Sequence, residues 1–217
     1  MQNENIVSDV IQVQNVATTS YSDGSQPAQS GGRQGEAAVA EIHGKWYTAG
    51  YRGVSFIAST LIAGTVVPIS TATAATFGLY NPLGSGKNVE LIAYDFALLA
   101  ATAVVASLEF AVLTAVGGGI ALPTGITALT PLANPIGGPG ANAVATAFSA
   151  ATVVASTKLI SLGVSFGTTT ETAGPAVVHR DFDGTIILAP GTLIHVTGNA
   201  AQTSAALQQL TWAEWPV

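Results

Sequence analysis

The feature that most constrains this chain is a long stretch without charge. All 48 residues between Glu109 and Lys158 lack a titratable side chain, and Ala, Val, Thr and Gly make up most of them. Charged residues are 8% of the whole chain, against about 25% in soluble globular proteins. Such a surface must be covered by lipid or by other subunits, or be solvated through hydroxyl and backbone groups. Because acid–base and nucleophilic catalysis need titratable groups, we expect no enzymatic activity.

Composition excludes several further classes of function. The 217 residues suffice for one domain with a sizeable core and an appendage. The absence of Cys rules out disulfides, Cys-ligated zinc and a thiol nucleophile. The net charge of −6 and six scattered basic residues argue against nucleic acid as a partner, because phosphate binding requires clustered Lys and Arg. The first ten residues lack the basic and apolar regions of a signal peptide.

Apolar residues recur with a period of two, which is typical of half-buried strands. Val, Ile, Thr and aromatic residues dominate these runs, as strands prefer. About eight such runs over about 170 residues predict an all-β fold, an antiparallel β-sandwich of jelly-roll type. The clearest faces are Ile92, Tyr94, Phe96 and Leu98, opposite Asp95; Val104, Ala106, Leu108, Phe110 and Val112, opposite Ser107, Glu109 and Ala111; and Ile160, Leu162, Val164 and Phe166.

The last quarter of the chain predicts three more strands. Residues Thr185–Ala189 and Leu193–Thr197 flank Pro190-Gly191, a turn dipeptide between two apolar runs. A final strand is expected through Leu207–Trp215. The Ala- and Gln-rich segment Asn199–Gln209 is the one candidate for a short helix.

A membrane span over Phe96–Leu122 is a competing interpretation, because only Glu109 is charged there. The carboxylate would lie near the middle of the bilayer, where it is costly. Three glycines at 117–119 would then break the helix, and the period is two rather than 3.6. We therefore expect a strand with Glu109 in water and no membrane span, with a membrane-active protein as a third alternative for function.

Two segments lie outside the strand pattern and are expected to make intersubunit contacts. Residues 1–45 are expected to form an extended N-terminal arm, and 46–217 the sandwich. A long Gly/Pro-rich loop at 117–142 interrupts that sandwich. The arm is expected to be anchored through Ile6, Val7, Val10, Ile11 and Val13, and the loop through Ile120, Leu122, Ile126, Leu129, Leu132 and Ile136.

The motifs that could carry chemistry are incomplete. Gly84-Ser85-Gly86-Lys87 lacks the glycine and the Ser or Thr of a phosphate-binding loop, which favours a strand-connecting turn. Two aspartates before a glycine, at 181–184, resemble the start of a calcium loop, but no further acid follows at the required spacing. His43, His179 and His195 are expected to be solvated strand histidines. Trp46, Trp212 and Trp215 are expected to be core or interface anchors rather than a sugar platform. We expect no metal and no cofactor.

Four segments carry a resemblance to a known group of proteins. They are TFGLYNPLGSGKN at 76–88, ILAPGT at 187–192, GNA at 198–200 and LTWAEWPV at 210–217. Together they resemble the turns and closing strand of small tailed-bacteriophage virion proteins, over residues 45–217. The resemblance implies a trimeric jelly-roll subunit attached to a capsid or tail, without enzymatic activity. The second Trp of the closing strand and the long loop depart from that pattern.

The sequence therefore predicts a structural virion protein. It would act as a capsid decoration (cement) or head-associated subunit, a homotrimer on the outer surface of the particle whose partner is the major capsid protein or another virion protein. Acidic charge suits the outside of a particle rather than its DNA-facing side. The alternative is a carbohydrate- or receptor-binding module of a phage fibre, using exposed aromatics and the turn with Asp181 and Asp183.

Overall fold

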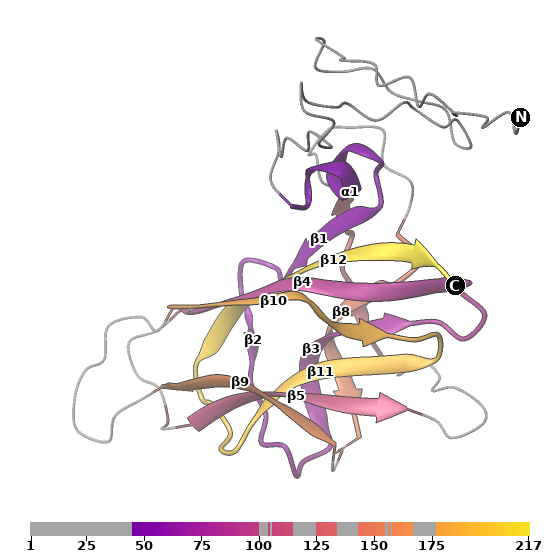
Figure 1. Cartoon of the computed structure of the whole chain (residues 1–217). Coiled ribbons are helices and arrows are strands. Elements are labelled where there is room, and N and C mark those ends of the chain that lie inside the picture. Colours follow the sequence, from indigo (N-terminus) through magenta and orange to yellow (C-terminus); the bar gives the residue numbers. More distant parts are fainter. Residues whose placement is uncertain are drawn as a thin grey trace, which may run out of the picture. The chain divides into compact units, whose positions relative to one another are not determined.

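The fold was examined in a computed structural model (Figure 1), which describes residues 45–99, 104, 106–114, 125–133, 143–154, 156, 158–166 and 177–217. One short helix, α1 (Tyr47–Tyr51), precedes the strands. The strands are β1 (Ser55–Ser59), β2 (Thr65–Val66), β3 (Ala74–Asn81), β4 (Lys87–Leu98), β5 (Ala106–Thr114), β6 (Thr127–Ala128), β7 (Leu132–Ala133), β8 (Thr146–Val153), β9 (Leu159–Phe166), β10 (Val177–Leu188), β11 (Thr192–Gly198) and β12 (Ala205–Pro216).

The strands form two antiparallel sheets that pack face to face. Sheet I has the order β10-β4-β12-β1-β7, with β2 also paired to β12. Sheet II has the order β6-β8-β3-β11-β5-β9. In Figure 1, β4, β10 and β12 run above β5, β9 and β11. The predicted all-β antiparallel sandwich is confirmed.

The main core lies between the two sheets, where the period-two faces meet. Tyr94 of β4 meets Phe110 of β5 edge to face, with ring centroids 5.4 Å apart. Phe110 in turn packs against Phe182 of β10 at 5.6 Å. Ala106, Leu108 and Phe110 point inward, as the alternation predicts. Aromatic side chains therefore join sheet I to sheet II near the middle of the sandwich.

Several successive strands lie in different sheets, and the predicted turns make two of these crossings. The turn with Gly84 and Gly86, both at positive φ, connects β3 of sheet II to β4 of sheet I. Pro190-Gly191 connects β10 of sheet I to β11 of sheet II. The strand-connecting interpretation of Gly84–Lys87 is thus confirmed, with the two strands in opposite sheets.

Two local predictions are wrong. Asn199–Gln209 contains no helix: residues 199–204 connect β11 to β12, which begins at Ala205. Within it, Ala206 and Gln208 are buried while Leu207 between them is exposed, so strand alternation overrides the helical preference of Ala and Gln.

The face of β4 also changes partway along the strand. Tyr94, Phe96 and Leu98 point into the core as predicted, but Ile92 lies outside the main core cluster. In the pairing with β12, Ala93 pairs with Thr211 and Leu91 with Trp212, which leaves Ile92 as the extra residue of a bulge. Leu91 and Val89 therefore take the inward positions, a change that periodicity alone does not reveal.

The described part of the loop expected at 117–142 forms sheet edges. Within its described part, residues 125–133, β6 pairs with β8 at the edge of sheet II. A few residues later, β7 pairs with β1 at the edge of sheet I. This part of the loop therefore crosses from one sheet to the other along one side of the sandwich.

Phe110→Ala tests the contact between the sheets. The side chain is fully buried between Tyr94 and Phe182. We expect the free energy of unfolding to fall by about 3–5 kcal/mol, measured by urea denaturation. Val154→Ala, at a side chain that is 58% exposed, should change it by less than about 0.5 kcal/mol. Equal losses for the two variants would contradict a core contact at Phe110.

Candidate functional site

One end of the sandwich, which we call the linked end, is joined by side-chain hydrogen bonds between the sheets. Asn81, fully buried at the end of β3, donates through Nδ2 to the carbonyls of Lys87 and Leu188, each at 2.8 Å. The backbone carbonyl oxygen of Asn81 accepts a hydrogen bond from Gly191 N, also at 2.8 Å. Asn81 thus joins the two inter-sheet turns, although their sequences lie about a hundred residues apart.

Glu214 makes the second link at this end. Its carboxylate is 3% exposed and accepts hydrogen bonds from Val144 N, Ala145 N and Trp212 Nε1, at 2.9 to 3.1 Å. All three donors are neutral. Neutral N–H groups therefore solvate the carboxylate in place of water, and the β12 strand of sheet I is fixed to the residues that lead into β8 of sheet II.

The outer face of sheet I carries a row of polar side chains across three strands. His179 and Gln209 lie opposite Asp95 on β10 and β12. Asp95 Oδ1 is 2.6 Å from His179 Nδ1, and its Oδ2 accepts from Gln209 Nε2 at 3.0 Å. We call these three side chains the polar row. It is a surface that can donate and accept hydrogen bonds.

The candidate calcium loop is a bulge inside β10. The pairing with β4 shifts between Asp181 and Ile186, and Asp183 adopts a positive φ of 52°. Asp183 N donates to Asp181 Oδ1 at 2.9 Å, so the first carboxylate serves the local backbone. Asp183-Gly184 therefore forms a bulge within a continuous strand rather than a turn between two strands.

The end of the sandwich opposite the linked end exposes apolar side chains. We call this surface the apolar rim, and its members are Leu61, Ile62, Val66, Leu99, Val177 and Leu207. Ile62 is 92% exposed and Val177 is 74% exposed. Apolar side chains exposed together mark an interaction surface more often than scattered ones do.

Backbone contacts bring the members of the rim together. The turn that holds Leu61 and Ile62 is closed by a 2.7 Å hydrogen bond from Gly64 N to Leu61 O. A Cβ on Gly64 would lie 2.9 Å from Leu99 Cδ1, so this turn packs against Leu99. Val177 and Leu207 flank Ala97 on the same face of sheet I. The rim is therefore built on paired strands and one tight turn.

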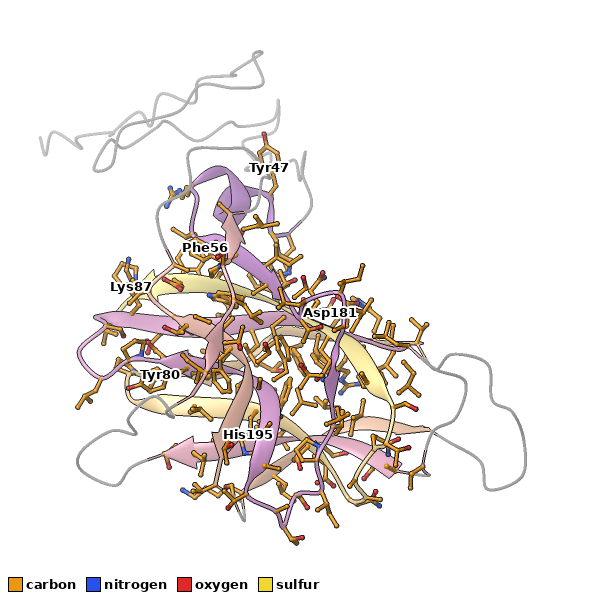
Figure 2. All side chains as sticks on the ribbon, turned by 180° about the vertical axis from the view of Figure 1, so that it is seen from behind. Tyr47, Phe56, Tyr80, Lys87, Asp181 and His195 are labelled. Atoms are coloured by element: carbon orange, nitrogen blue, oxygen red, sulfur yellow. The ribbon has the colours of Figure 1, made fainter. Side chains whose placement is uncertain are left out.

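The two histidines that the structure describes lie on different sheets. His179 is exposed in the polar row, as expected, whereas His195 is 2% exposed on β11 of sheet II. The expectation of a solvated His195 is wrong, because Phe148 and Tyr80 pack on the same face of that sheet. Burial lowers the pKa of His195 from 6.5 to about 4. Figure 2 shows His195 and Asp181 on different sheets, and His43 lies outside the described residues.

Glu109 also differs from its prediction. It was expected in water on the outer face of β5, but it is half-buried and its Oε2 atom is inaccessible to solvent.

The tryptophans divide as expected for structural anchors. Trp212 is fully buried in the core, and Trp215 is half-buried with its Nε1 donating to Glu90 Oε2 at 2.6 Å. Trp46 is half-buried before α1.

The predicted interface residues fall in different places. Leu132 is 52% exposed on β7, whereas Leu129 lies in the chain's own core and Ile126 packs against a second, smaller cluster. Leu129 is thus used within the chain. The other predicted anchors lie outside the described residues: Ile6, Val7, Val10, Ile11, Val13, Ile120, Leu122 and Ile136.

Among the described residues, no three His, Asp or Glu side chains are grouped so that they could hold a metal ion. No helix in that part of the chain is long and apolar enough to cross a membrane. No protein-family model, curated protein or solved structure matches the sequence or the fold.

Asn81 and Glu214 were missed as key residues, although the sequence contains a signal for one of them. In a strand, Glu214 shares a face with Trp212, two residues earlier. A carboxylate on the same face as a core tryptophan indicates a buried acid. Asn81 has no comparable signal, because Asn-Pro at a turn ordinarily serves its own backbone. Its links to Leu188 and Gly191 depend on the tertiary fold.

Glu214→Gln tests the buried carboxylate. A glutamine with its oxygen at the Oε1 position can still accept from all three donors, but its N–H₂ group then faces Val144 N and replaces a 2.9 Å hydrogen bond with a donor–donor contact. We expect the free energy of unfolding to fall by about 1–3 kcal/mol in urea denaturation. Glu90→Gln is the matched control, since the amide oxygen can still accept from Trp215 Nε1. If both variants retain wild-type stability, the hydrogen bonds of Glu214 do not stabilise the fold.

Proposed function

We propose that this chain is a structural subunit of a virus particle that acts through protein–protein contacts, as a capsid decoration or head-associated protein. The observation that carries the proposal is the apolar rim on a chain with 8% charged residues. Burying one large aliphatic side chain contributes about 1.5–3 kcal/mol. Contact with other subunits at the rim would therefore be favourable, and Ile62 and Val177 are its most exposed members.

The nature of the partner rests on the sequence resemblance and on charge. The segments that resemble phage virion proteins include both inter-sheet turns and the closing strand, and Asn81 and Glu214 place all three at the linked end. The segments that carry the resemblance therefore lie together at one end of the sandwich. The proposed assembly is a homotrimer with a jelly-roll sandwich, on the outer surface of the particle and in contact with the major capsid protein.

Light scattering tests self-assembly through the rim. At micromolar concentration we expect the wild type at about three times the 21.8 kDa mass of one chain. Leu61→Ser with Ile62→Ser removes two of the most exposed rim side chains and should lower the mass toward that of a monomer. Leu83→Ser is the matched control: Leu83 is 60% exposed, but it lies in the turn at the linked end. A monomeric wild type would refute the assembly.

Deletion of residues 1–40 tests the proposed role of the arm. Its anchors lie outside the described residues, and a flexible Gly/Ser-rich tether at 22–35 would raise the effective concentration of the body at a particle. We expect the truncated protein to keep the far-UV circular dichroism of a β-sandwich but to be lost from particles in sedimentation. Unchanged occupancy on particles would place the attachment in residues 41–217.

The polar row favours a second candidate function, a carbohydrate- or receptor-binding module. Carboxylate, imidazole and amide groups in one row could bind sugar hydroxyls on the outer face of sheet I. Trp212 contributes no platform for a sugar ring, because it is fully buried. Specific binding on a glycan array that is lost in Asp95→Ala would favour this function over a purely structural one.

A further inference from the structure

Two buried polar groups without hydrogen-bond partners lie on the outer face of sheet II. Within the part of the chain that the structure describes, neither ring nitrogen of His195 makes a hydrogen bond of good geometry, and Glu109 Oε2 has no partner. A backbone interaction with Val196 partly opposes the lowering of the His195 pKa by burial. The other carboxylate oxygen of Glu109 accepts from Ser107 Oγ at 3.4 Å. A buried donor or acceptor without a partner costs about 1–3 kcal/mol. Two such residues in one region therefore need a common explanation.

Strand register places the two residues on the same face. Thr197 of β11 pairs with Glu109 of β5, and His195 pairs with Ala111. Ile194 and Val196, on either side of His195, belong to the main core, so His195 points the other way. His195 and Glu109 are thus diagonal neighbours across two hydrogen-bonded strands, a separation of roughly 7–8 Å between Cα atoms. Long side chains can meet across that distance.

An aromatic layer keeps water from His195. Gly78 of β3 pairs with His195, and a Cβ on Gly78 would lie 2.6 Å from Phe148 Cζ. The ring of Phe148 therefore covers the position where a larger residue would project. Tyr80, Leu193 and Val153 form one buried cluster with Phe148. The imidazole can reach water only if this layer moves.

One acid faces the imidazole from the neighbouring strands. Glu109 comes from β5, Tyr80 is the titratable residue of β3 on this face, and the described residues of β8 and β11 contribute no other charged group. Lys158, at the start of β9, has its Nζ at Thr114 Oγ1, 3.1 Å away. Glu109 is therefore the partner that a charged His195 would meet.

The sign of the pH effect follows from burial. His195 has a pKa of about 4 in the folded chain and about 6.5 when exposed. Between these values the unfolded chain binds a proton that the folded chain does not, so acid favours opening. The contribution of neutral His195 to stability is complete above about pH 6.5, and it is lost progressively as the pH falls toward 4.

We propose that His195 and Glu109 form an acid-triggered switch in sheet II. At mildly acidic pH the layer around Phe148 opens, His195 takes up a proton, and an ion pair with the Glu109 carboxylate stabilises the opened form. That ion pair gives a partner to Glu109 Oε2 and to one ring nitrogen of His195, and water can reach the other nitrogen in the opened form. The switch belongs to a single chain and does not depend on assembly.

Urea denaturation and binding of an apolar dye, from pH 7.5 to 5, test the switch. The wild type should lose stability and gain dye fluorescence as the pH falls. His195→Leu should flatten both curves, because the titrating group is gone. Glu109→Gln should move the dye transition to lower pH, since the opened form loses its ion pair. His179→Gln, at the exposed histidine of the polar row, is the matched control and should behave as the wild type does.

The outcomes separate the two parts of the proposal. Wild-type pH dependence in His195→Leu would overturn the switch, and an unshifted dye transition in Glu109→Gln would overturn the ion pair. If His195→Leu does not fold, the His ring signals of the wild type can be followed by NMR. A buried ring that titrates well below 6.5 supports the switch, whereas three rings that all titrate near 6.5 refute it.

Discussion

The fold depends on the hydrogen-bonded burial of a few polar groups in a chain that has little charge. Glu214 is the clearest case, because three neutral N–H donors surround its carboxylate. A buried carboxylate is normally paired with a cation, and this chain has six Lys and Arg residues in all. Backbone donors take that role here. They come from the residues leading into sheet II, so the solvation of one acid also fixes the relative position of the two sheets.

The two ends of the sandwich are consequently different surfaces. At the linked end, Asn81 and Glu214 use side-chain hydrogen bonds to join turns and strands from both sheets. At the other end, the rim side chains are exposed on a framework of paired strands. The strands that carry the rim are already paired in the single chain. Binding of a partner to the rim therefore costs little conformational entropy. The linked end also exposes Leu83 and Val217, at 60% and 80%, so the two ends differ in their hydrogen bonds more than in their apolar exposure.

The sequence predicted the architecture well and the chemistry poorly, for a physical reason. Strand alternation is a local property, so the faces with Phe96 and Leu108 could be assigned without a structure. The fate of a polar side chain depends on residues far along the chain. Glu109 and His195 occupy alternating positions that predict exposure, yet a second layer around Phe148 covers the face of sheet II. Helical preference misled at Asn199–Gln209 for the same reason, since the inward face of β12 decides that segment.

The low charge also changes which polar residues are informative about function. In a chain with many charged side chains, a buried histidine could lack a partner because neighbouring charged groups bind the available donors and acceptors. Here the carboxylate of Glu214, the amide of Gln208 and the Nδ2 group of Asn81 have hydrogen-bond partners from the protein itself, whereas Asn81 Oδ1 has none. Even Tyr94, whose pKa burial raises well above 10, donates to Gln208 at 3.0 Å. Against that pattern, the lack of partners at both ring nitrogens of His195 is an exception that packing alone does not explain. A conformation in which His195 is charged and paired with Glu109 gives it a physical reason.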